Sequence, residues 1–220
     1  MLLIIIKYLL HNTLSSAGDV LKNSSANLSA LGFVPKYKSD IPISQLVVDR
    51  NPKSMIAESF RALRSNMQFI SNTPGPKIAA VTSTVSGEGK TFIAINLAGI
   101  IAFTGKKVVI IDLDMRKPKI HIGFNAENDI GMSTLLINKN NIDDCIKRSE
   151  LKGLDFITAG PIPPNPSELI ISAKLDEIID QLKKRYDLIM IDNPPIGLVT
   201  DGIKCVQKAD YPIYIFRSDY

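Results

Sequence analysis

Short apolar runs alternate with longer stretches of helical character along most of the chain. The apolar runs lie at 77–83, 106–114, 154–160, 186–194 and 211–216, and helical stretches such as 91–103 and 172–186 separate them. Strands that are buried on both faces read as continuous apolar runs, and helices between them cover both faces of a parallel sheet. The pattern therefore predicts an α/β fold with a doubly wound, mainly parallel sheet, and it places Tyr211 and Tyr214 in a buried strand.

One more helix is predicted by apolar side chains at helical spacing. In the segment MIAESFRALRSNMQFI these side chains recur every three or four residues, at Ile56, Phe60, Leu63, Met67 and Ile70. Such a stripe is typical of a helix that packs one face against a core. Glu58, Arg61 and Arg64 lie off the stripe, where a solvated charged face is the usual interpretation.

The amino-terminal segment has a different character. Residues 1–10 (MLLIIIKYLL) are almost all apolar, but they are fewer than the ~20 residues that span a bilayer. A polar stretch rich in Ser and Asn follows, as in a flexible linker. The apolar run is either a terminal strand or helix packed on the body, or the cytoplasmic end of a transmembrane helix. We expect a juxtamembrane segment and linker over 1–48, and over 49–220 one domain that is truncated at its carboxyl end.

Composition adds little to this picture. The chain has 220 residues, and 26 Lys and Arg against 22 Asp and Glu leave a net charge of +4. So small an excess gives no reason to expect a nucleic-acid partner. Cys145 and Cys205 lack the spacing of a zinc site and cannot build a disulfide framework, so they fit reduced thiols in a cytoplasmic chain.

The strongest chemical signal follows the first apolar run, in TSTVSGEGKT (82–91). Gly89, Lys90 and Thr91 match the end of the phosphate-binding loop G-x-x-x-x-G-K-[ST], while Thr84 stands at the place of its first glycine. In such a loop, backbone N–H groups converge on phosphate oxygens, the lysine offsets phosphate charge and the hydroxyl ligates Mg²⁺. A glycine-rich turn that only caps a helix is the alternative, which the flanking strand and helix disfavour.

Three acidic side chains come at the ends of predicted strands. Asp112 and Asp114 follow the run VVII, and Asp192 ends the run LIMI. The carboxyl ends of parallel strands meet at one edge of the sheet, where ligands bind in open α/β folds. A single acid at such a place is commonly a helix cap. Three of them beside a phosphate loop predict the binding of Mg²⁺ and a nucleotide.

Other P-loop proteins fit the sequence less well. A partitioning or division-site ATPase needs a second lysine early in its loop, but Val85 occupies that position. A GTPase would carry N-K-x-D, whereas the pair Asn138-Lys139 is followed by two asparagines. A scaffold that binds nucleotide without transferring phosphate stays open as an alternative.

Taken together, the motifs resemble those of the bacterial tyrosine kinases, the cytoplasmic kinase domains of polysaccharide co-polymerases. TSTVSGEGKT, VVIIDLDMRKP and LIMIDNPP are similar to the family's Walker A, Walker A′ and Walker B motifs. TAGPIPPNPSELI (158–170) and ESFRALRSN (58–66) are similar to two further family segments. The resemblance covers roughly residues 31–220.

The resemblance implies an ATP-dependent tyrosine kinase that autophosphorylates neighbouring subunits and regulates the synthesis and export of capsular polysaccharide or exopolysaccharide. The cofactors would be ATP and Mg²⁺. The nucleotide would be held by Ser86, Gly87, Glu88, Gly89, Lys90, Thr91, Phe92 and Arg116. Thr91 would ligate the metal, and Asp114 and Asp192 would order its water shell. Asp112 would orient or deprotonate the tyrosine hydroxyl, a role that Asp114 could exchange with it.

The resemblance also implies assembly at a membrane. Glu58, Arg61 and Arg64 match the family's E-x-x-R-x-x-R pattern, so subunit contacts in a homo-oligomeric ring are expected there. The expected partners are a transmembrane activator or chain-length-determinant region, in the same or a partner chain, and the polysaccharide export machinery, at the cytoplasmic face of the bacterial inner membrane. The tyrosines here are scattered rather than clustered in a tail, so weak autophosphorylation is expected.

Overall fold

The structure describes the body of the chain and little of its amino-terminal segment. A computed structural model describes residues 18, 29–37, 46–70, 74–197 and 202–218. The apolar run at 1–10 and the prediction made for it lie outside these residues. Within the described ranges, no helix combines the length and the apolar character needed to cross a bilayer.

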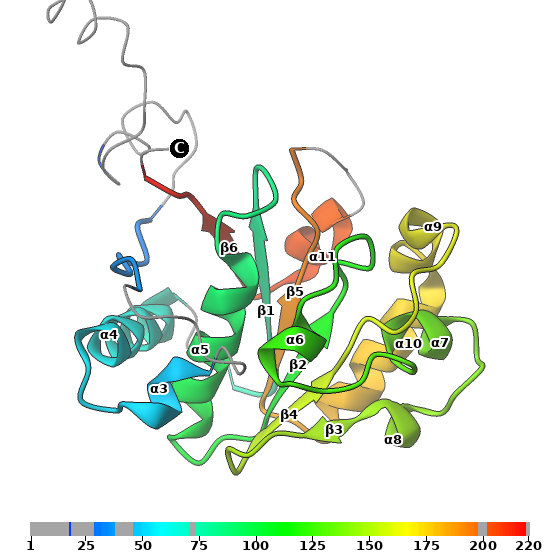
Figure 1. The fold of residues 1–220 in the computed structure, drawn as a ribbon, viewed down its shortest axis with the longest axis horizontal. Coiled ribbons are helices and arrows are strands. Elements are labelled where there is room, and N and C mark those ends of the chain that lie inside the picture. The colour runs from blue at the N-terminus through cyan, green and yellow to red at the C-terminus, as the bar shows by residue number, and fades with distance from the viewer. Residues whose placement is uncertain (1–17, 19–28, 38–45, 71–73, 198–201, 219–220) are drawn as a thin grey trace, which may run out of the picture.

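A mainly parallel sheet forms the centre of the molecule (Figure 1). Its strands are β1 (Lys77–Ser83), β2 (Val108–Asp112), β3 (Lys147–Arg148), β4 (Leu154–Ile157), β5 (Leu188–Asp192) and β6 (Tyr211–Ile215). The strand order is β3-β4-β2-β5-β1-β6. In the described sheet β3 pairs antiparallel with β4, and the other pairs are parallel. The predicted doubly wound, mainly parallel sheet is confirmed, with β3 as an addition that the apolar pattern did not indicate.

Helices cover both faces of this sheet. They are α3 (Val47–Arg50), α4 (Met55–Ile70), α5 (Lys90–Ala102), α6 (Ile120–Gly123), α7 (Met132–Leu136), α8 (Ile142–Cys145), α9 (Pro166–Ile170), α10 (Ala173–Lys183) and α11 (Ile203–Lys208). Side chains alternate along a strand, so Ala79 and Val81 of β1 pack in one core with α3, α4 and α5. Ile78 and Ala80 pack in a second core with α7, α9 and α10.

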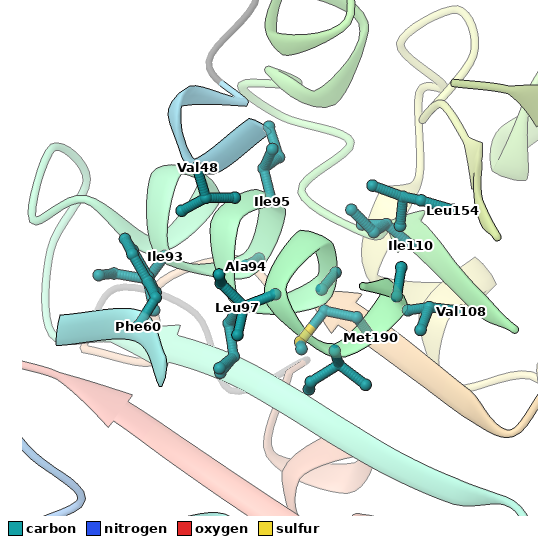
Figure 2. Packing of buried hydrophobic residues seen from close by; sticks show 14 of the residues in the cluster. Val48, Phe60, Ile93, Ala94, Ile95, Leu97, Val108, Ile110, Leu154 and Met190 are labelled. Atoms are coloured by element: carbon teal, nitrogen blue, oxygen red, sulfur yellow. The ribbon is translucent and has the colours of Figure 1, made fainter. Parts of the chain in front are cut away.

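The helix α5 is buried along most of its length (Figure 2). Its apolar side chains pack on strand residues such as Met190 and, on the other side, on Phe60 of α4. Asn96 of α5 is fully buried, and its Oδ1 accepts the N–H groups of Val47 and Val48 at 2.9 and 3.2 Å. The domain core therefore includes Val47 and Val48, just before the predicted boundary at residue 49.

Two side chains that the sequence placed in the core lie at the surface. Along α4 the predicted stripe is buried as far as Met67, but the side chain of Ile70 is 54% exposed. The strand β6 lies at the edge of the described sheet, and Tyr214 is 38% exposed. The prediction of a fully buried β6 was wrong, because in the described sheet this strand lies at the edge and pairs only with β1.

Candidate nucleotide site

The phosphate loop joins β1 to α5 as the sequence predicted. Its two glycines, Gly87 and Gly89, have φ angles of +100° and +98°, values that favour glycine because a Cβ is strained there. Gly89 is the N-cap of α5 and Lys90 its first residue. Because the first N–H groups of a helix have no partner within the helix, the turn presents donors to an anion. The strand, loop and helix therefore form a geometry that suits phosphate.

Contacts from within the loop and from a neighbouring segment support its shape. Oε2 of Glu88 accepts the backbone N–H of Val85 at 2.9 Å. The carbonyl oxygen of Thr84 accepts the N–H of Gly197 at 3.1 Å. A Cβ on Gly197 would lie 2.4 Å from that carbonyl oxygen, so a side chain larger than hydrogen does not fit. The segment after β5 thus approaches the phosphate loop at backbone distance.

The loop and two of the predicted acids meet at the start of α5. The hydroxyl of Thr91 donates to Oδ2 of Asp192 at 2.6 Å. The ammonium of Lys90 lies 4.0 Å from Oδ2 of Asp114. Asp112 is the register partner of Asp192 on the adjacent strand. The three acids and the end of the phosphate loop are therefore brought together at the carboxyl edge of the sheet, as the strand-end positions predicted.

Burial shifts the acid equilibria of these carboxyls. It raises the pKa of Asp192 to about 7, although the hydrogen bond from Thr91 and the charge of Lys90 oppose the shift. Burial also raises the pKa of Asp114, again against Lys90. For Asp112, burial and the nearby Asp192 charge raise the pKa well above its ordinary range. Burial therefore favours the protonated forms of all three carboxyls, while the Lys90 ammonium favours the ionised forms of Asp114 and Asp192.

Asp112 is held differently from the other two acids. Its side chain is fully buried. Its Oδ1 accepts the backbone N–H of Asp114 at 3.0 Å, and its Oδ2 accepts those of Lys119 and Ile120 at 3.2 and 3.1 Å. These bonds fix the segment that follows β2. The catalytic role expected for Asp112 stays a prediction, and in this structure its carboxylate serves the backbone.

Some polar atoms at the end of β5 have no partner among the described residues. They are Oδ1 of Asp192 and both side-chain polar atoms of Asn193, a fully buried residue. A buried polar atom without a hydrogen bond costs about 1–3 kcal/mol, so these atoms mark a place for water or a ligand. The sequence prediction did not include Asn193, and its position directly after a Walker B acid was the available signal.

Two residues expected to hold nucleotide contact other parts of the fold. The ring of Phe92 packs on the core, with its centroid 6.0 Å from that of Phe60 and 6.2 Å from that of Tyr37. The expected nucleotide contact of Phe92 stays a prediction, and with its ring packed in the core that contact would come from the backbone. Arg116 donates to Oγ of Ser167 in α9 at 2.7 Å.

Glu58, Arg61 and Arg64 are gathered on α4 and not at the nucleotide site. Arg61 pairs with Glu58 at 2.6 Å in the same helix and also donates to the carbonyl of Pro52. Nε of Arg64 is buried and has no hydrogen-bond partner among the described residues. The predicted subunit contact therefore involves α4 and is separate from the nucleotide site.

Known families and proteins match this fold and these motifs. A family model described as an AAA domain matches residues 76–216. Tyrosine-protein kinase YwqD of Bacillus subtilis is 39% identical over 167 residues, which are 76% of this chain and 70% of YwqD. Tyrosine-protein kinase Wzc of Salmonella typhimurium is 38% identical over 84% of this chain, but the match spans only 25% of Wzc. The chain thus corresponds to most of the short relative and to about a quarter of the long one.

Solved structures agree with the sequence relatives. The chimerical protein CapA2B2 is 40% identical, with a TM-score of 0.78 over 88% of this chain and 82% of that one. The kinase domain of the Escherichia coli tyrosine kinase ETK is 28% identical, with a TM-score of 0.79 over 85% of this chain and 76% of that one. The cell division ATPase MinD of Pyrococcus furiosus reaches a TM-score of 0.51 at 25% identity, which disfavours the partitioning alternative. The chain belongs to the family of bacterial tyrosine-protein kinases.

Proposed function

We propose that this chain binds Mg·ATP and transfers its γ-phosphoryl group to tyrosine hydroxyls of neighbouring copies. The convergence of Lys90, Thr91, Asp114 and Asp192 at the end of the phosphate loop carries this proposal. Lys90 and the loop N–H groups hold the β- and γ-phosphates and offset their charge. There is little covalent chemistry for a protein to do in phosphoryl transfer, so positioning and charge neutralisation supply most of the rate.

The donor set at the end of β5 fits Mg²⁺. This ion prefers hydroxyl and carboxylate oxygens and keeps several of its waters, and Oδ1 of Asp192 is a buried oxygen without a partner among the described residues. Thr91 would bind the ion directly, while Asp114 and Asp192 would hold its waters. Bound there, Mg²⁺ neutralises charge on the β- and γ-phosphates. Its positive charge would also favour the ionised forms of the three buried acids.

Asp112 and Asp114 are the candidates for handling the tyrosine proton. Asp112 has the higher affinity for a proton, since burial and the charge of Asp192 raise its pKa. Asp114 is slightly exposed and lies beside the Lys90 ammonium. We assign the orienting or proton-accepting role to Asp112, on the basis of its place beside Asp192 in the sheet.

Assembly and location extend the proposal. Glu58, Arg61 and Arg64 would contact the next subunit of a ring, and the side chains of Glu58 and Arg61 are exposed enough to reach a partner. A head-to-tail arrangement presents one copy's tyrosines to the next copy's active site. In the cell, the protein would act at the cytoplasmic face of the membrane with a transmembrane partner region, and it would regulate the synthesis and export of capsular polysaccharide or exopolysaccharide.

Mixing two forms of the protein tests the transfer. The Lys90→Met variant serves as the acceptor and the wild type, carrying an affinity tag, as the enzyme, with γ-labelled ATP and Mg²⁺. Labelled phosphotyrosine in an added Glu- and Tyr-containing polymer supports tyrosine kinase activity. Labelled phosphotyrosine in the Lys90→Met copy supports transfer between copies. Nucleotide binding without any labelled phosphotyrosine would instead support the scaffold alternative.

A further inference from the structure

The exposed edge strand β6 contacts the phosphate loop through a side chain that the predicted mechanism does not use. The hydroxyl of Tyr214 lies 2.9 Å from Oγ1 of Thr84. Tyr214 is the register partner of Thr82 on β1. Thr84 lies two residues further along the chain, and an aromatic side chain can reach such a diagonal neighbour. The loop residue that replaces the first glycine of the phosphate-loop pattern is thus joined to the neighbouring strand.

Two more contacts restrict the same region. The ring of Phe216 packs on that of Tyr214, with centroids 4.7 Å apart, which orients the phenol. Arg217 donates to the carbonyl of Gly87 at 3.4 Å. The carboxyl end of β6 therefore contacts the loop near its beginning, through Tyr214, and near its glycine turn, through Arg217.

Thr84 is held on two sides as a result. Its backbone carbonyl accepts the N–H of Gly197 from the segment after β5, and its side chain meets Tyr214 of β6. Thr84 is otherwise exposed, so no core packing fixes its hydroxyl. A threonine side chain has rotamers that a glycine lacks, so fixing it costs conformational entropy. When this ordering happens only on ligand binding, the cost lowers the affinity for the ligand. A hydroxyl partner that orders Thr84 beforehand lowers that cost.

We propose that Tyr214 is a positioning residue for the phosphate loop. It acts through Thr84, holds the loop in its phosphate-binding shape, and makes the affinity for Mg·ADP and Mg·ATP higher than that of a loop without this contact. This inference rests on the proposed function, in which the loop binds nucleotide phosphates. Tyr214 itself touches neither the metal nor the transferred group, so its loss is expected to change KM and Kd rather than kcat.

The test measures Mg·ADP affinity by calorimetry for a set of single-hydroxyl variants. Tyr214→Phe and Thr84→Val should each weaken binding about twofold to twelvefold, the value of one hydrogen bond of about 0.5–1.5 kcal/mol. The double variant should bind no more weakly than either single variant, and Thr84→Ser should keep near wild-type affinity. Tyr186→Phe is the matched control, because it removes a hydroxyl that donates to Asp155 at 2.8 Å elsewhere in the fold. Its Mg·ADP affinity should equal that of the wild type.

The outcomes separate this inference from the proposed function. Absence of Mg·ADP binding by the wild type would overturn both. If the wild type binds Mg·ADP and Tyr214→Phe binds it with an affinity within 1.5-fold of the wild type, only the role of Tyr214 is overturned. The same holds if the loss of affinity in the double variant equals the product of the two single losses. Thermal unfolding of Tyr214→Phe should match the wild type within experimental error, and its KM for ATP should rise with kcat unchanged. If Tyr214→Phe unfolds at a lower temperature and its KM for ATP is unchanged, the contact between Tyr214 and Thr84 only stabilises the fold, and the inference is overturned.

Discussion

The hydroxyl of Thr91 donates a 2.6 Å hydrogen bond to Oδ2 of Asp192, across 101 positions of the chain. This contact joins the first turn of α5 to the end of β5, and it leaves the other carboxylate oxygen of Asp192 without a partner among the described residues. A threonine after the loop lysine and an acid at the end of a buried strand are the two halves of a Mg²⁺–nucleotide site. Here they are assembled by the fold itself.

The first prediction follows from the raised pKa of Asp192, about 7. An unfolded aspartate has a pKa near 4, so between about pH 4 and pH 7 the native state holds a proton that the unfolded state has lost. The free energy of unfolding therefore falls as pH rises through this window and levels off above it. Asp192→Asn removes the effect, so its stability relative to the wild type should increase from pH 5 to pH 8, by about 2–3 kcal/mol.

Urea unfolding without nucleotide at both pH values measures this difference. Asp180→Asn is the control, because it removes an exposed carboxyl that pairs with Lys183 of the same helix, so the difference between the two variants isolates the effect of burial. If Asp192→Asn gains nothing over the wild type between pH 5 and pH 8, the assignment of a raised pKa to Asp192 is wrong.

The second prediction concerns Asp112. Asp112→Asn should leave the affinity for Mg·ADP within about threefold of the wild type, because the phosphate loop is intact, and should lower the transfer rate roughly 100-fold or more. The amide cannot accept all three backbone N–H groups that the carboxylate binds, so the variant should also unfold at lower urea concentration. Single-turnover transfer together with calorimetry separates the two effects. An unchanged transfer rate would leave Asp112 with its structural role alone.

The third prediction concerns assembly through α4. The double change Arg61→Ala and Arg64→Ala removes the guanidinium groups proposed to contact a neighbouring subunit, so the protein should run as a monomer in light scattering. Circular dichroism should report an unchanged fold, since Arg61 makes its described contacts at the surface. The matched control changes Lys183, the last residue of α10, and Lys184, which follows it, to alanine. A mass distribution equal to that of the wild type would make these arginines an ordinary solvated face.

The sheet and the nucleotide loop could be predicted because local sequence determines both. Runs such as VVIID form strands wherever a sheet can bury them, and Gly87 and Gly89 permit backbone angles that other residues avoid. The two-residue strand β3 left no pattern, because two residues are too few to show a period. The prediction for residues 1–10 falls outside the described residues.

The wrong predictions of burial share one cause, because burial depends on which elements pack together in the folded chain. The sequence around Tyr214 and around Ile70 is apolar, but whether an apolar segment is covered depends on which elements pack beside it. Asn193 was missed because an amide after a strand-end acid reads as a turn former, and its burial appears only in the folded chain.

The most direct test compares two lysine variants in one assay of labelled phosphotyrosine. Lys90→Met removes the buried ammonium beside Asp114, and Lys106→Met removes an exposed one in the loop before β2. With γ-labelled ATP, Mg²⁺ and a Glu- and Tyr-containing polymer, Lys106→Met should transfer phosphate at the wild-type rate. Lys90→Met should lose roughly 100-fold or more, as expected when a charge-stabilising group is removed from a phosphoryl-transfer site. Equal transfer by Lys90→Met and the wild type would contradict the account.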